Sequence, residues 1–329
     1  MPEIDTDQFS ARLRKKAIDL QVKKVLITRL AGSEQEQDIQ LPTNCKGYGR
    51  VRHFKRQSST GWPENPLPID PAASRLGMKR PDVLLALVFQ NAVCNWRCWY
   101  CYVPWPQLNG DQKLSAWFSA AELIDLYLQI KDPPKVIDLS GGQPDLTPEW
   151  IVWTMRELEA RKLSDKVYLW SDDNLSNDYL LRYLSKHDLE YMRNYRMYGK
   201  VCCFKGFDEQ SFAFNTNAAP NLFARQFEIF KSHMSLGLDL YGYATFTSPQ
   251  NDNVKGSMIS FVDKLQQIHH NLPLRTIPLE IRSFAPMKDR NDENATVIQS
   301  QAIEEWNLEI EKRFSAEERR RPIYEVSLT

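Results

Sequence analysis

The stretch VFQNAVCNWRCWYC, residues 88–101, holds three cysteines in the spacing C-x3-C-x2-C, at Cys94, Cys98 and Cys101. It overlaps the end of an apolar run, residues 83–90, whose composition predicts a buried strand. Thiolates are the soft ligands that iron–sulfur clusters need. Three of them in one loop can hold a cubic cluster and leave one iron free for a small molecule. The triplet therefore predicts a single 4Fe–4S cluster.

A zinc site is the alternative for the same cysteines. Structural zinc takes four ligands, usually from paired C-x2-C knuckles, and the sequence has no second pair with this spacing. Cys202 and Cys203 are adjacent, which is poor geometry for chelating one ion, and they lie in an apparent buried strand. We expect both to be core residues, and we treat Cys45 as structural or incidental.

The composition indicates a globular chain without net charge. The 329 residues include 42 Lys and Arg and 42 Asp and Glu, so overall charge gives no argument for nucleic acid or an acidic membrane surface. No apolar run approaches the ~20 residues of a membrane span, and the N-terminus is too polar for a signal peptide. We therefore expect a cytoplasmic protein, whose thiols stay reduced.

Strand and helix patterns alternate from residue 81 onward. Strand candidates lie at residues 83–90, 135–140, 167–171, 201–205, 238–247 and 277–284, with helical patterns between them. Six βα units in succession imply a parallel sheet with right-handed crossovers. Such a sheet is either open or curled. We expect an α/β fold built as a partial (β/α)6 barrel of parallel strands.

The chain divides into three expected parts. Residues 1–80 form an N-terminal extension or cap, residues 81–290 the barrel, and residues 291–329 a C-terminal helical segment. The extension has 15 Lys and Arg against 9 Asp and Glu, a net charge of +6. The extension is either an ordinary solvated surface or a binding surface for an anionic partner or substrate. Residues 44–74 are rich in Pro, Gly and Ser and predict an irregular wrap, with His53 in a basic surface stretch.

Two motifs together resemble the radical S-adenosylmethionine (SAM) superfamily. Tyr100 is an aromatic residue directly before the last cysteine of the triplet, and in the family this residue packs near the adenine of SAM. After the next strand comes the run Ser140-Gly141-Gly142-Gln143-Pro144. It looks like the family's GGEP segment, which binds the methionine amino group. Gln143 stands where glutamate is usual and lacks its charge. The resemblance therefore predicts that Gln143→Glu keeps or raises the affinity for SAM.

The resemblance also implies roles for residues at the ends of later strands. Polar groups after the third strand reach the ribose in relatives, and the candidates here are Ser171, Asp172 and Asn174. A helix cap and turn is the alternative for these residues. The fourth strand leads into KGFD, residues 205–208, which resembles a run of the activating-enzyme branch, where glycyl radicals are generated in partner enzymes. Lys205 is a candidate contact for a carboxylate, or the last solvated residue of its strand.

The last two strands supply candidate substrate contacts. Alternation places Tyr241 and Tyr243 on one face of the fifth strand, either as the wall of a substrate cavity or as packed barrel interior. Glu280 and Arg282 share a face of the sixth strand, either as an ion pair that closes the barrel or as a grip on an anionic substrate. The candidate catalytic residues are Lys205, Tyr241, Tyr243 and Arg282.

The resemblance implies an enzyme with one 4Fe–4S cluster and SAM as cofactors. The cluster, reduced by an electron donor such as flavodoxin or ferredoxin, cleaves SAM to a 5′-deoxyadenosyl radical, which takes a hydrogen atom from the substrate. Only two cysteines follow the triplet, too few for an auxiliary cluster. The branch resemblance favours a partner protein as substrate. The alternatives are a small molecule, peptide or nucleoside, or a non-catalytic iron–sulfur protein. Neither a membrane nor nucleic acid is expected as a partner.

Overall fold

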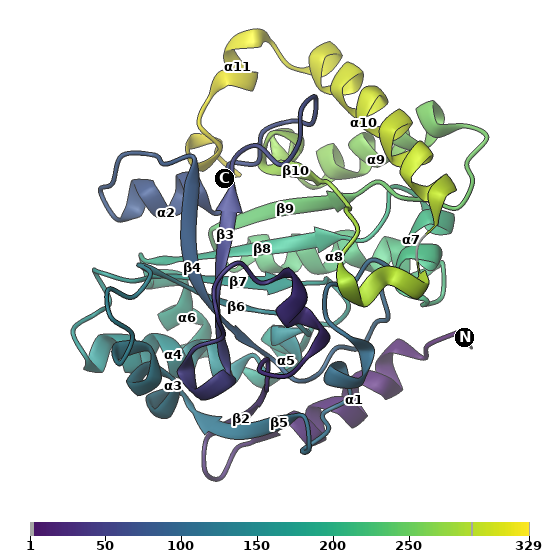
Figure 1. Ribbon diagram of the computed structural model, residues 1–329. Helices are drawn as coiled ribbons and strands as arrows, with labels where there is room; N and C mark the ends of the chain where they lie inside the picture. Colours follow the sequence, from purple (N-terminus) through teal and green to yellow (C-terminus); the bar gives the residue numbers. More distant parts are fainter. Residues whose placement is uncertain (1–2, 291, 329) are drawn as a thin grey trace.

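The computed structural model describes residues 3–290 and 292–328. Its main sheet consists of β3 (Gly49–Lys55), β4 (Val83–Gln90), β6 (Val136–Ser140), β7 (Tyr168–Asp173), β8 (Tyr198–Phe204), β9 (Leu240–Thr245) and β10 (Thr276–Leu279). The strand order is β10-β9-β8-β7-β6-β4-β3, and every neighbouring pair is parallel except β3 and β4. The sheet curls into a half-barrel (Figure 1), which confirms the expected α/β partial barrel of six parallel strands.

Helices pack against one face of this sheet. They are α3 (Ala120–Leu128), α4 (Glu149–Ala160), α5 (Tyr179–Tyr183), α6 (Lys186–Asn194), α7 (Glu209–Thr216), α8 (Leu222–Ser235) and α9 (Val254–Ile268). A capping box starts α3, where Ser119 and Glu122 bond each other's backbone N–H groups. Between strands and helices lies the larger apolar core, in which Phe204 of β8 stacks on Phe230 of α8. The helices therefore occupy the outer face and leave the concave face to other groups.

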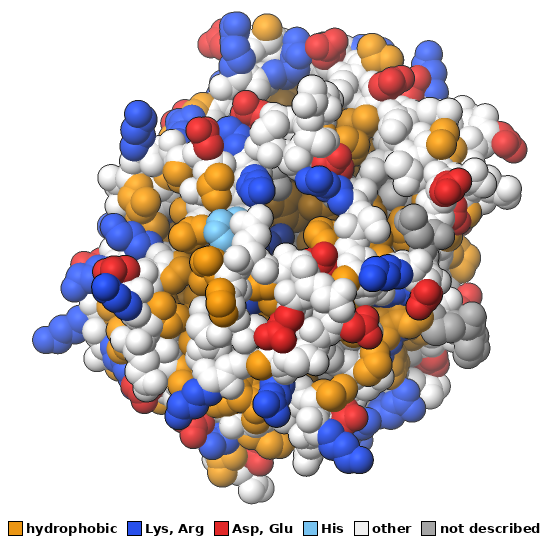
Figure 2. Space-filling model, viewed as in Figure 1, with side chains coloured by type: hydrophobic (Ala, Val, Ile, Leu, Met, Phe, Trp, Pro, Cys, Tyr) orange, Lys and Arg blue, Asp and Glu red, His pale blue; other side chains and the backbone are white. Residues whose placement is uncertain are grey.

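Aromatic side chains fill the barrel interior near the start of the parallel strands. Trp170 is fully buried, with its ring centroid 6.3 Å from that of Tyr168 and 5.5 Å from that of Tyr241. Successive strand residues point to opposite faces, so these rings alternate with residues that face the helices. The interior is thus closed at the amino ends of the strands. Figure 2 shows a hollow over the concave face, with Lys and Arg side chains beside it.

The N-terminal part contains one strand where an irregular wrap was expected. α1 (Thr6–Ala17) leads into β1 (Ile18–Asp19) and β2 (Lys24–Thr28), which form a small antiparallel sheet with β5 (Ser115–Ser119). β3 then pairs with β4 from Gly49 to Lys55. The expected irregular wrap is therefore wrong for residues 49–55, and His53 is a half-buried strand residue. The reason is that backbone pairing with β4 fixes β3, although its basic sequence lacks the apolar character of a core strand.

A segment after β3, residues 56–68, crosses to the opposite edge of the sheet. Trp62 Nε1 donates a hydrogen bond to the Pro278 carbonyl of β10 over 3.3 Å. Glu280 accepts a hydrogen bond from Ser59, and Arg282 donates to the Ser58 carbonyl over 3.0 Å. Within the described ranges no ion pair joins Glu280 to Arg282, because each contacts the crossing segment. This segment closes the gap between the edge strands β3 and β10.

The C-terminal part is helical and packs on the outside of the barrel. α10 (Glu293–Arg313) lies against α9, and its Trp306 ring is 5.5 Å from Phe246 and 6.2 Å from Phe261 between centroids. α11 (Ala316–Arg320) follows. Of the helices formed by the described residues, none is both long and apolar enough to cross a bilayer.

Candidate cluster and cofactor site

The three cysteines of the triplet share one loop at the carboxyl end of β4. Cys94 and Cys98 are buried, and Cys101 is partly exposed. Two arginines hold the loop by its carbonyl groups: Arg97 donates to the Cys94 carbonyl over 2.6 Å, and Arg290 donates to the Cys101 carbonyl over 3.1 Å. Because these bonds use the backbone, the thiol groups remain available as ligands.

The three thiols are not as close together as the ligands of a single zinc ion. Zinc with Zn–S bonds near 2.3 Å requires sulfur atoms about 3.8 Å apart. The triplet is not among the groups of described residues whose ligand atoms all lie within 4.8 Å of one another. Burial raises the pKa of Cys98 to about 12, so the free thiol is neutral and iron must displace its proton.

Two polar groups point at the sulfur atoms themselves. The Val103 backbone N–H donates to Cys101 Sγ over 3.4 Å, and Asn174 Nδ2 lies 3.8 Å from Cys94 Sγ. Donors to cluster-bound sulfur stabilise the thiolate form and tune the reduction potential. Both contacts are of the kind that would tune a cluster held by the triplet.

The GGQP segment, residues 141–144, lies directly against the cysteine loop. The Gln143 backbone N–H donates to the Val93 carbonyl over 2.7 Å. Gly141 and Gly142 both have positive φ angles, +65° and +66°. A Cβ atom on Gly142 would lie 2.4 Å from the Asn91 carbonyl oxygen, so only glycine permits this approach. The glycines thus bring the segment to the loop that holds the cysteines.

The side chain of Gln143 does not face the open end of the barrel. Its Nε2 donates to Asp173 Oδ1 over 2.7 Å, and its Oε1 accepts from the Asn174 backbone N–H over 2.9 Å. The residue is 1% exposed. Both ends of the amide are therefore satisfied within the protein, and the geometry opposes the expectation that a glutamate here would improve cofactor binding.

A polar cluster on the concave face lies beside the GGQP segment. Ser140 donates a short hydrogen bond to Asp172, and Arg52 of β3 donates to Asp138 over 3.2 Å. Asp172 Oδ1, Asp138 Oδ1 and both amide atoms of Gln90 are buried without hydrogen-bond partners among the described residues. Unpaired buried polar atoms are rare in folded proteins. Their concentration at the carboxyl ends of β4, β6 and β7 indicates a site for a polar ligand.

Tyr100 and Lys205 also lie at this end of the barrel. The Tyr100 hydroxyl is 3.1 Å from Thr245 Oγ1 at the end of β9, and the Lys205 ammonium is 5.8 Å from the centre of the Tyr100 ring. Tyr243 lies one layer deeper, where its hydroxyl bonds to Asn65 of the crossing segment over 3.0 Å. The structure thus brings the triplet, Tyr100 and Lys205 together.

Other candidate residues lie elsewhere. The Ser171 hydroxyl bonds to Tyr198 over 2.7 Å on the helix-covered face, and Asn174 binds the cysteine loop. Tyr241 lies near the amino end of β9, where its hydroxyl bonds to Asp239. Arg282 is exposed and bonds to the crossing segment. Alternation gave the correct face for Tyr241, but the height of a residue along the barrel depends on the strand register.

Several residues of the site were missed from the sequence. Arg50 and Arg52 lie at this face, although the sequence predicted a basic surface stretch. Helix α1 supports the cysteine loop: Thr6 accepts from Trp96 Nε1 over 3.0 Å, and Ser10 accepts from Asn95 over 2.8 Å. The alternation Arg-x-Arg in residues 50–52 was the one sequence pattern that could have indicated a strand with both arginines on the same face. Nothing in residues 6–10 marks them as partners of the triplet.

Comparisons with known proteins give limited information. No protein-family model matches the chain, and no curated protein sequence matches it. Among solved structures, SuiB of Streptococcus suis is similar in three forms, each with 16% sequence identity. The TM-scores are 0.40 for SuiB bound to precursor peptide SuiA, 0.35 for SuiB bound to S-adenosylmethionine, and 0.39 for a third SuiB structure. The matches cover 55%, 54% and 56% of this chain and 36%, 35% and 38% of SuiB. The chain therefore spans little more than a third of SuiB, and a likeness of this size says nothing about activity.

Proposed function

We propose that this chain is a radical SAM enzyme with one 4Fe–4S cluster on Cys94, Cys98 and Cys101. The observation that carries the proposal is the direct contact between the triplet loop and the GGQP segment, made by the Gln143 backbone N–H and the Val93 carbonyl. Two sequence motifs 47 residues apart, counted from Cys94 to Gly141, meet at the carboxyl ends of neighbouring parallel strands. Ligands of parallel α/β sheets collect at this edge.

The proposed SAM site lies between the triplet and the polar cluster. Gly141 and Gly142 expose backbone there, Tyr100 offers an aromatic wall, and Asp172 and Ser140 are placed for hydroxyl groups of a ribose. Lys205 is the proposed partner of a carboxylate, because its ammonium lies near the Tyr100 ring at the same end of the barrel. Gln143 takes a positioning role, since Asp173 and Asn174 already use its side chain.

The chain's own residues bind, orient and shield the reactants. When bound, the cluster and SAM supply reductive cleavage and hydrogen-atom abstraction. The buried aromatic layer of Tyr168, Trp170 and Tyr241 closes the barrel from below, and the crossing segment closes it from the side. Exclusion of water protects reactive species from side reactions. An external donor such as flavodoxin or ferredoxin would approach where Cys101 is partly exposed.

The proposed substrate is a partner protein or peptide, on the sequence resemblance to the activating-enzyme branch. A small anionic molecule, such as a nucleotide derivative, is the second candidate. It is favoured by Arg50 and Arg52, which β3 places at the concave face. Arg52 is paired with Asp138, whereas Arg50 Nε has no hydrogen-bond partner among the described residues.

The test is anaerobic reconstitution with iron and sulfide, followed by dithionite and SAM. We expect release of 5′-deoxyadenosine by the wild-type chain and its loss, together with the iron, in Cys98→Ala. Cys45→Ala is the matched control, because Cys45 is buried outside the triplet. A reconstituted protein that holds about four irons and releases no 5′-deoxyadenosine would contradict the proposal and favour a non-catalytic iron–sulfur protein. Repeating the assay with peptides and nucleotides separates the two substrate classes.

A further inference from the structure

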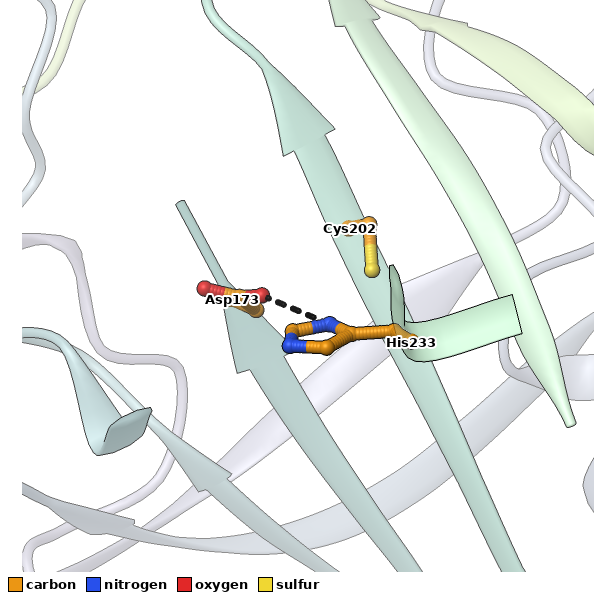
Figure 3. A group of neighbouring side chains, drawn as sticks. All are labelled: Asp173, Cys202 and His233. Atoms are coloured by element: carbon orange, nitrogen blue, oxygen red, sulfur yellow. Dashed lines mark ion pairs between the residues drawn. The ribbon is translucent and has the colours of Figure 1, made fainter. Parts of the chain in front are cut away.

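A second group of metal-ligand side chains lies behind the GGQP segment, on the helix-covered face of the sheet. Asp173 ends β7, Cys202 lies opposite it on β8, and His233 comes from α8 (Figure 3). One ligand atom from each residue lies within 4.8 Å of the other two. All three residues are essentially inaccessible to solvent. The three side chains converge from separate elements on one buried point.

The polar atoms of this group lack the partners that burial normally demands. His233 Nδ1 lies 3.4 Å from Asp173 Oδ2, but the geometry is not that of a hydrogen bond. Among the described residues neither nitrogen of His233 has a hydrogen-bond partner, and Asp173 Oδ2 has none either. Buried polar groups are bonded in the great majority of cases. His233 Nδ1 and Asp173 Oδ2 approach each other without a hydrogen bond, which points to a missing ligand between them.

Charge leads to the same conclusion. Nearby, Lys200 and Asp145 form a fully buried ion pair at 2.6 Å, so their charges cancel. No Lys or Arg in the described part of the chain pairs with Asp173. A buried carboxylate without a counter-charge is unfavourable. A divalent cation bound to one carboxylate and one thiolate makes the whole group neutral.

We propose that Asp173, Cys202 and His233 bind a structural zinc ion, separate from the cluster site. Thiolate, imidazole and carboxylate are the three ligand types of protein zinc sites. The mixed set suits zinc better than magnesium or calcium, which prefer oxygen alone. Asp145 lies beside Asp173 but outside the group of ligand atoms within 4.8 Å of one another, so its side chain would have to turn toward the ion to serve as a fourth ligand.

The ion would support the cofactor segment through Asp173. While Oδ2 faces the metal site, Oδ1 of the same carboxylate accepts from Gln143 Nε2 over 2.7 Å and from the Leu175 N–H over 2.9 Å. A metal-bound carboxylate cannot rotate freely, so the amide of Gln143 is fixed and the GGQP segment is held at the cysteine loop. The ion thus has a positioning role and makes no contact with the reactants.

Metal analysis of a variant without the cluster tests the proposal. The parent is the full chain with Cys94→Ala, Cys98→Ala and Cys101→Ala, dialysed against chelator to remove surface metal. We expect about one zinc per chain in this parent and less than a tenth of that after Cys202→Ala or His233→Gln. Cys203→Ala is the matched control. It removes the same side chain one residue later on β8, on the opposite face, and should retain the zinc.

A second measurement covers the case in which Cys202→Ala does not fold. The parent with Cys203→Ala is loaded with Co²⁺ in place of zinc, and its absorption spectrum is recorded. A tetrahedral cobalt spectrum with a sulfur-to-cobalt charge-transfer band supports the proposal. Absence of zinc from the parent, retention of zinc by a folded Cys202→Ala, or a cobalt spectrum without sulfur ligation would overturn it. None of these outcomes depends on the activity proposed for the cluster.

Discussion

Replacing Gln143 by glutamate, the residue usual in the radical SAM superfamily, should destabilise this protein. In the wild type the Gln143 amide donates to Asp173 over 2.7 Å and accepts from the Asn174 backbone. Glutamate would keep the acceptor and lose the donor, so two carboxylates would meet in a buried site. One of them must take up a proton, or the pair must separate.

The expected loss in the free energy of unfolding follows from the hydrogen bond between Gln143 and Asp173 that the variant lacks. A hydrogen bond to a charged group contributes about 1.5–3 kcal/mol. If the new carboxyl keeps that bond by holding a proton, its pKa rises above the ~4.3 of an unfolded chain, at a cost of about 1.4 kcal/mol per unit. A carboxyl whose pKa is raised in the folded state favours folding at low pH, and this advantage is lost as the pH rises through the folded value. The deficit of the variant should therefore be small near pH 5 and reach about 3 kcal/mol at pH 8.

Urea unfolding followed by circular dichroism at several pH values gives the free energy of unfolding. Gln301→Glu is the control, because Gln301 is exposed in the middle of α10. This substitution adds the same charge without changing a buried contact. Calorimetry of the reconstituted variant should show weaker SAM binding. A variant that matches the wild type at pH 8 and binds SAM more tightly would refute the reasoning. It would show that residue 143 contacts the cofactor directly, as the sequence motif predicts.

Three further predictions concern the concave face and the N-terminal part. Burial, and then Asp172, raises the pKa of Asp138 to about 7. Wild-type stability should therefore fall as the pH rises from about 4 to about 7, and Asp138→Asn should flatten this slope by about 1 kcal/mol per unit in urea titrations. Deleting residues 1–75 removes β3 and the α1 support of the triplet, so the melting temperature should fall by about 10 °C or more, and an unchanged value would contradict this integration. Trp62→Ala removes the bond to β10, and limited proteolysis should then cut residues 56–68 several times faster, whereas an unchanged rate would show that Trp62 does not hold the segment.

The parallel strands could be predicted from the sequence because each is a short apolar run. The expected strand at residues 83–90 coincides with β4. β8 begins at Tyr198, three residues before the expected start at residue 201. Gly199 and Lys200 look like the end of a turn in the sequence. In the structure Lys200 is fully buried because Asp145, 55 residues earlier, neutralises it, and no local pattern reports such a partner.

The motif residues were easier to predict than the groups that orient them. The spacing predicts a cluster site at the cysteine triplet, and the resemblance to the GGEP segment predicts that residues 141–144 belong to the same site. The supporting contacts come from α1, from β3 and from Arg290. Thr6 of α1 lies 90 residues before its partner Trp96 in the cysteine loop, and Arg290 lies 192 residues after its partner Cys98. Basic residues such as Arg52 looked solvated, because the sequence does not show that β4 will pair with β3 and place them at the concave face.

The end of β7 shows why a motif fixes the location of this site and not the direction of its side chains. Asp172 and Asp173 are neighbours, so they point to opposite faces of the sheet. Asp172 lies in the polar cluster, where it accepts a hydrogen bond from Ser140. Asp173 lies on the side of α8, where it accepts a hydrogen bond from the Gln143 amide. A carboxylate behind the segment makes an amide the compatible residue at position 143, because an amide can donate where a second carboxylate cannot. The glutamine that stands where the radical SAM motif has glutamate is thus matched by Asp173, and we expect a change at either residue to require a compensating change at the other.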